Sequence, residues 1–194
     1  MEDRFQKQLA FLVEIDRLKN VYRQNVLMDS SRHENDAEHS WHLAMAGIVL
    51  SEYAPHIDLL RAIKMTLVHD LVEIDAGDTF AYDEAGHKSK EKRERLAAER
   101  IFAILPEKTG CQLCALWEEF DQGKSAEAEF ANALDRMIPF LHNMHSQGYT
   151  WRQHDVRRTQ VQERMEPVLR VFPQMRVYIE EKMDEAVKNG WLKE

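Results

Sequence analysis

The chain has 194 residues, enough to bury the core of one domain of ordinary size without disulfides. Its net charge of −8 disfavours a nucleic-acid polymer as substrate, because such binding depends on Lys and Arg contacts with phosphates, whereas a small phosphate ester needs positive charge only locally. The N-terminal residues lack the basic start and apolar run of a signal peptide, and no stretch of about 18 apolar residues occurs. We therefore expect no membrane segment and a cytoplasmic location.

Helical periodicity accounts for nearly the whole chain. Apolar residues recur at three- and four-residue steps, as on one face of an amphipathic helix, and no stretch alternates as a strand would. Loops are expected at about 25–36 and 78–90, and the second of these could overhang a site. The expected helices span about 5–21, 36–50, 57–74, 96–105, 109–120, 125–146, 151–172 and 173–188.

The sequence predicts an all-α chain with a single domain over residues 1–194. It contains no repeat, no low-complexity tract and no linker rich in Pro, Gly or Ser. The core of the domain is expected over about 9–172, with a C-terminal helix over about 173–190. The stretch 57–74 is apolar nearly all round, which is typical of a central, buried helix.

Residues 67–73, with the sequence LVHDLVE, place three ionisable side chains inside an apolar run. Burial of His69, Asp70 and Glu73 without compensation would be costly. On a helix, Glu73 follows His69 by four residues and Asp70 by three, so all three side chains lean towards one groove. A cation in that groove is the simplest compensation.

Further ligands for such a cation must come from other helices. Asn35 and Glu38 have the spacing of a capping box, which places His39 in the first turn of a helix. Asp135 interrupts the apolar face of a later helix. Taken singly, each residue has an ordinary structural explanation, such as a hydrogen-bonded core pair or an ion pair with a neighbouring Arg. Together they form the candidate metal quartet, which consists of His39, His69, Asp70 and Asp135.

The order of these motifs in a helical chain resembles the HD-domain metal-dependent phosphohydrolases, and within them the YfbR/HDDC-type 5'-deoxynucleotidases. The resemblance extends from about Leu9 to Phe172. It includes residues 18–23, residues 34–40 and Gly77-Asp78 as well as the quartet. It implies an HD-domain helical bundle that binds one divalent transition metal, either Mn, Co, Fe, Ni or Zn, through the quartet, and two imidazoles with two carboxylates suit such an ion.

The resemblance also implies roles for four other residues. Glu73 and Asp78 are the candidates for acid–base catalysis. Arg23 is the candidate for binding the nucleotide phosphate, with Arg32 as a weaker second candidate. After Arg23 the sequence departs from the family, because Gln24-Asn25 follows where Trp or Gly-Trp is common, so the base and sugar preferences stay open.

Three other histidines, His42, His142 and His145, could be taken for ligands of a second metal. A binuclear HD site usually needs additional His ligands in fixed contexts. We therefore interpret His142 and His145 as structural or pocket-lining.

The predicted function is hydrolysis of a nucleoside 5'-monophosphate, most simply a deoxynucleotide, to nucleoside and phosphate. One alternative keeps the fold and metal but acts on another phosphate ester or a nucleoside polyphosphate, or as a di-iron oxygenase. Another is a helical binding module that retains the metal ligands without turnover. A homodimer is also expected, since family members often form dimers and apolar residues in 168–172 and 177–179 could leave a self-association surface.

Overall fold

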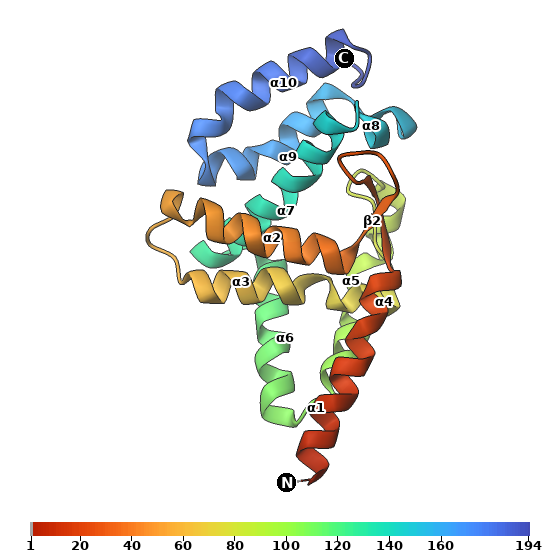
Figure 1. The fold of residues 1–194 in the computed structure, drawn as a ribbon, viewed down its shortest axis with the longest axis vertical. Coiled ribbons are helices and arrows are strands. Elements are labelled where there is room, and N and C mark those ends of the chain that lie inside the picture. The colour runs from red at the N-terminus through yellow and green to blue at the C-terminus, as the bar shows by residue number, and fades with distance from the viewer. Residues whose placement is uncertain (1) are drawn as a thin grey trace.

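The computed structural model, which describes residues 2–194 apart from the side chains of Glu2, Glu84 and His87, is built almost wholly of helices (Figure 1). The α-helices are α1 (Glu2–Ile15), α2 (Asp36–Leu50), α3 (Leu59–Val68), α4 (Glu73–Ala76), α5 (Glu84–Phe102), α6 (Glu107–Gln122), α7 (Ala126–His145), α8 (Tyr149–Gln153), α9 (Arg158–Val171) and α10 (Arg176–Lys188). Short 3-10 helices are η1 (Asp16–Asn20), η2 (Ser51–Tyr53), η3 (His69–Val72) and η4 (Pro173–Met175). The all-α class predicted from periodicity is confirmed.

Helices α2 and α3 pack side by side across the middle of the molecule, and α7 packs against both of them and against α9 (Figure 1). Helix α1 and the N-terminal end lie at one end of the long axis, and α10 with the C-terminus lies at the other. None of the helices within residues 2–194 is both long enough and apolar enough to cross a membrane.

Two main apolar clusters hold these elements together. One cluster gathers α7, α9 and α10, with Phe130, Met165 and Ile179 almost fully buried in it. The other packs α5 and α6 against η3, with Ile101 and Val72 at its centre. The segment that follows α3 is therefore packed into the second cluster, through Leu71 and Val72.

The segment 25–36 is not only a loop, because two short strands lie in this region. Strands β1 (Tyr22–Val26) and β2 (His33–Asn35) pair antiparallel, with Tyr22 opposite Asn35. The expectation that no strand occurs was wrong. Strands of five and three residues are too short for alternating polarity to stand out from a loop.

The expected helix over 57–74 is also interrupted. Residues 69–72 tighten into η3, and the chain then resumes as α4. Burial is concentrated at this end, since residues 68–73 are all buried whereas Leu60 is 61% exposed and Leu67 46%. Burial all round, predicted for the whole stretch, therefore holds only for its last part, whereas α3 buries one face that includes Ala62 and Met65.

Two other boundaries differ from expectation. Helix α5 begins at Glu84, inside the expected loop, because Asp83 caps it by accepting hydrogen bonds from the backbone N–H of Ala85 and Gly86. The first turns of α5 are polar, so apolar periodicity could not show them. The expected helix over 151–172 is divided into α8 and α9 by a turn in which Asp155 has a φ of 55°.

Candidate metal centre

His69 lies where α3 gives way to η3, and its ring is held by the backbone. Nδ1 of His69 is 2.9 Å from the carbonyl oxygen of Thr66, to which it can donate a hydrogen bond. This bond fixes the tautomer and leaves Nε2 as the nitrogen with a free lone pair. Nε2 is buried, has no hydrogen-bond partner among the described residues, and lies 3.0 Å from Oδ1 of Asp70.

His39 reaches the same point from α2. The capping box that the sequence predicts is present, since the Asn35 side chain accepts from the N–H of Glu38 and the Glu38 side chain accepts from the N–H of Asn35. It starts α2 at Asp36 and sets His39 in the first turn, fully buried. Nε2 of His39 lies 3.0 Å from Oδ1 of Asp135 on α7.

The four residues of the quartet therefore lie together. Oδ1 of Asp135 is also 3.8 Å from Nε2 of His69, which connects the two histidines and the two aspartates in one group. Burial lowers the pKa of His69, but Asp70 and Asp135 outweigh it and raise that pKa to about 10. Burial raises the pKa of Asp70, but His69 and Arg23 outweigh it and hold that pKa well below its usual value. The cluster thus attracts positive charge.

The donor set fits a divalent transition metal. A buried imidazole nitrogen without a hydrogen-bond partner, Nε2 of His69, faces two carboxylates and a second imidazole. Two nitrogen and two oxygen donors suit the borderline ions from Mn to Zn. His39, His69, Asp70 and Asp135 are the residues that would hold such an ion.

Arg23 enters the site from β1. Its Nη1 donates to Oδ2 of Asp70 over 2.8 Å and to Oδ1 of Asp36 over 3.1 Å. Its side chain is only 11% exposed, so the ion pairs are shielded from water. Burial lowers the pKa of Arg23, but Asp70 and Asp78 outweigh it and raise that pKa, which keeps the guanidinium charged.

Glu73 and Asp78 face the same space from the far side of η3. In a 3-10 helix the side chains at i and i+3 eclipse, and this brings Glu73 towards Asp70. Burial, together with Asp70 and Asp36, raises the pKa of Glu73 well above its ordinary value. Asp78 follows the sharp turn at Gly77, where φ is 72°, and burial raises its pKa as well.

A cavity of about 310 Å³ opens onto this cluster. It lies within the range of small-molecule sites. Arg23, Glu73, Asp78 and three of the quartet residues line it, as do aromatic side chains that include Phe80, Tyr82 and Trp151.

Several residues of this site could not be recognised from the sequence. Asp36 is fully buried beside Arg23, yet an Asp after Asn35 reads as an ordinary helix start. Lys90, Arg136 and Arg164 supply further positive charge to the cavity. Of these three, only Arg136 could have been indicated by the sequence, because it directly follows Asp135. Lys90 and Arg164 lie in polar helical stretches where nothing distinguishes them from surface residues.

One interpretation of the sequence, that of Arg32, needs correction. Arg32 does not line the cavity, because it lies beyond β1 at the hairpin turn, where it pairs with Glu38 over 2.6 and 2.8 Å. Its predicted role in substrate binding is therefore not supported. His142 is buried and His145 is exposed, and neither lines the cavity.

Comparisons with known proteins identify the family of this chain. A family model described as "HD domain" matches residues 15–176. The 5'-deoxynucleotidases HDDC2 of Bos taurus and Homo sapiens are 32% and 33% identical over 129 residues. These matches cover 66% of this chain but 62% of each relative, so the chain matches less than two thirds of the length of these curated relatives.

A solved structure is similar over the full chain. It is that of a protein from Magnetospirillum magnetotacticum described as a predicted metal-dependent phosphohydrolase, with a TM-score of 0.94 and 45% identity. The similarity covers 100% of this chain and 97% of that one. The resemblance seen in the order of motifs is thus confirmed, and the chain belongs to the HD-domain family.

Proposed function

We propose that this protein is a metal-dependent 5'-nucleotidase that hydrolyses nucleoside 5'-monophosphates, preferably deoxynucleotides, to nucleoside and phosphate. The observation that carries the proposal is the convergence of His39, His69, Asp70 and Asp135 beside a buried arginine, at a cavity that three of the four residues line. The similarity to the 5'-deoxynucleotidases HDDC2 and to a metal-dependent phosphohydrolase supports the same reaction class.

The quartet would hold one divalent transition metal. When bound, such an ion polarises a phosphoryl oxygen and makes water a better nucleophile. Arg23 binds and orients the phosphate, since its guanidinium is charged, shielded from solvent and directed at the quartet by Asp36 and Asp70. Lys90 and Arg164, on the cavity wall, add positive charge that favours a phosphomonoester dianion.

Glu73 and Asp78 carry the proton transfers. One orients and deprotonates the attacking water, and the other protonates the 5' oxygen of the leaving nucleoside, which is a poor leaving group as an alkoxide. Both line the cavity, and Glu73 has a carboxylate oxygen, Oε2, that is buried without a hydrogen-bond partner among the described residues. That oxygen is available to a bound water or substrate.

The aromatic wall of the cavity would receive the nucleoside. The rings of Phe80 and Tyr82 meet edge to face with centroids 5.4 Å apart, and Phe80 also packs on His154 at 4.2 Å. A nucleobase can stack on such rings. These residues occupy the loop that the sequence predicts to overhang the site.

We also propose that the protein forms a homodimer. Of the apolar residues expected from the sequence to form its surface, Val168, Phe172 and Ile179 are buried within the chain and only Val177 and Tyr178 are exposed, so they offer little area to a partner. On α2, by contrast, Trp41, Met45 and Ile48 are exposed and recur at the spacing of one helix face, which we call the α2 apolar face. Replacing Met45 by Glu and measuring mass by sedimentation would test it, since an unchanged dimer would exclude this face.

A cytoplasmic location is part of the proposal. Cys111 and Cys114 are both free thiols, and Cys111 is exposed. Exposed thiols persist in a reducing compartment. Fractionation of cells that express the protein checks this, and recovery from an oxidising compartment would contradict it.

The decisive experiment is a substrate panel with metal-loaded protein. The protein is stripped with a chelator, reloaded with Mn²⁺ or Co²⁺, and offered deoxy- and ribonucleoside 5'-monophosphates, 3'-monophosphates, nucleoside triphosphates and p-nitrophenyl phosphate. Inorganic phosphate should be released fastest from 5'-monophosphates, and not at all by the Asp135→Ala variant. Release only from other esters would shift the function to another phosphohydrolase, and no release from any compound would exclude hydrolysis.

A further inference from the structure

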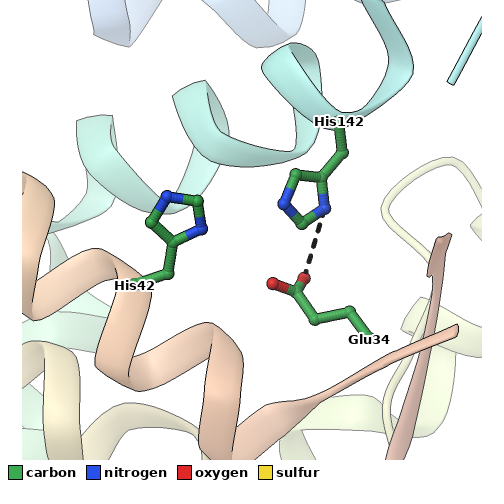
Figure 2. A group of neighbouring side chains, drawn as sticks. All are labelled: Glu34, His42 and His142. Carbon is green, nitrogen blue, oxygen red and sulfur yellow. Dashed lines mark ion pairs between the residues drawn. The ribbon is translucent and has the colours of Figure 1, made fainter. Parts of the chain in front are cut away.

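A second group of potential metal ligands lies on the opposite side of His39 from the cavity. Glu34 on β2, His42 on α2 and His142 on α7 direct their side chains towards one another (Figure 2). One ligand atom from each, two ring nitrogens and one carboxylate oxygen, lie within 4.8 Å of one another. None of the three residues lines the cavity of the candidate active site. We call this group the Glu34 triad.

Burial in the Glu34 triad is not compensated by hydrogen bonds. Glu34 is 1% exposed and His142 is 3% exposed. Oε2 of Glu34 and Nδ1 of His142 are 3.6 Å apart, and neither atom has a hydrogen-bond partner among the described residues. The two atoms form an ion pair that is longer than a hydrogen bond, marked by the dashed line in Figure 2. Because buried polar atoms in native proteins are nearly always hydrogen-bonded, this separation points to a ligand that both atoms contact.

His42 completes the group and leaves a path to solvent. Its ring lies 5.8 Å from that of His142, centroid to centroid, and it is only half-buried. Within residues 2–194 it takes part in no hydrogen bond or ion pair. An ion could therefore enter past His42 and find two inner ligands already in place.

We propose that Glu34, His42 and His142 form a second divalent metal site, distinct from the candidate metal quartet. Two imidazoles and one carboxylate, with room for a fourth ligand from solvent, are a donor set that Zn²⁺ accepts readily. Because its ligands come from β2, α2 and α7, an ion bound here would tie the hairpin to the two helices. From the sequence alone we interpret His142 as structural or pocket-lining, and the geometry assigns it a ligand role.

The two sites meet at one carboxylate. Oε2 of Glu34 lies 3.3 Å from Nδ1 of His39 as well as 3.6 Å from Nδ1 of His142. Glu34 therefore stands between an imidazole of the quartet and the second site. A substitution at Glu34 would disturb both sites. The test is therefore made at His42, which forms no hydrogen bond or ion pair with a quartet residue within residues 2–194.

The experiment counts Zn²⁺ bound per chain by titration of chelator-treated full-length protein, followed by elemental analysis. The wild type should bind two ions, His42→Ala one, and Asp135→Ala one, retained at the Glu34 triad. His145→Ala is the matched control and should bind two ions. His145 is exposed and lies near the end of α7, the helix that also carries His142. Circular dichroism verifies the fold of each variant.

A second variant and a second measurement guard against misfolding. His142→Gln should also reduce the count to one, and Co²⁺ substitution should give two sets of visible absorption bands in the wild type but one set in His42→Ala. A count of one in the wild type, or an unchanged count in His42→Ala, would overturn the proposal. Either result would leave the proposed nucleotidase reaction untouched, since that reaction depends on the quartet.

Discussion

The backbone carbonyl oxygen of Thr66, 2.9 Å from Nδ1 of His69, holds the imidazole so that Nε2 faces Asp70. The anchor is part of the chain and is set by the end of α3. His69 therefore needs no side-chain partner to keep its tautomer.

Replacement of His69 by Ala should abolish tight metal binding. We expect the affinity for Mn²⁺ or Co²⁺ to fall by at least about 100-fold. Loss of a residue that only hydrogen-bonds a metal ligand already costs up to about 100-fold in metal affinity, and loss of the ligand itself should cost more. Calorimetric titration measures the effect. Asp155→Asn, which removes an exposed carboxylate paired with Lys193 over 2.7 Å, is the control and should bind as the wild type does. If His69→Ala and Asp155→Asn bound the metal with equal affinity, the metal site would have to lie away from His69.

Metal binding should stabilise the fold, because the quartet joins α2, η3 and α7. At a free metal concentration of about 100 times the dissociation constant, the free energy of unfolding should rise by about 2.7 kcal/mol. Urea unfolding with and without chelator measures this. No difference in His69→Ala, set against a clear difference in the wild type, would locate the stabilisation at the quartet.

Glu73→Gln should separate catalysis from binding. The amide keeps the size of the side chain but cannot exchange a proton, so kcat should fall by about 100- to 10,000-fold while metal content stays the same. Glu91→Gln, an exposed change on α5, is the matched control. An unaltered kcat in Glu73→Gln would assign the proton transfers to Asp78 alone, whereas no turnover in the wild type would favour the binding-module alternative.

Arg23→Ala and Arg32→Ala should behave very differently. Loss of Arg23 leaves the buried carboxylates of Asp36 and Asp70 without their partner, which should cost about 3 kcal/mol of stability and raise KM for the nucleotide. Arg32 pairs with Glu38 at the surface, so its removal should leave the urea midpoint and KM close to wild type. Similar changes in KM for both variants would restore Arg32 as a substrate residue.

Asn35→Ala tests the capping box under the quartet. Its side chain accepts from the N–H of Glu38 over 3.0 Å, and losing this cap should cost about 1 kcal/mol of stability. Because His39 lies in the turn that the cap begins, metal affinity should fall as well. Asn35→Asp, which can cap equally well, should retain both, and loss of affinity in that variant would show that the amide has another role.

The sequence singles out the four residues that the structure brings together, for a physical reason. Ionisable residues inside apolar stretches are costly, so His69, Asp70 and Asp135 stand out from the pattern around them. The capping box locates His39 in the first turn of a helix, and its pattern is local because it consists of two residues three positions apart. Features that depend on local periodicity or on one local hydrogen bond can therefore be predicted from the sequence.

The rest of the site depends on contacts between distant segments. Arg23 meets Asp70, 47 residues further along, because the hairpin folds back over η3, and neither short strand has a pattern that indicates this. The 3-10 turn at residues 69–72 reflects the packing around it, since the same sequence satisfies the period of an α-helix. Arg32 was assigned to the substrate because nothing local shows that its partner is Glu38.

The span between His39 and Asp135 bears on how the protein is made. These two residues meet across 96 positions of the chain, and α7, which carries Asp135, also forms the centre of the larger apolar cluster. During synthesis, the N-terminal ligands emerge long before the helix that completes their site. We therefore expect the nascent chain to pass through a stage in which His39, His69 and Asp70 lack Asp135, so the proposed set of four ligands is complete only when α7 docks.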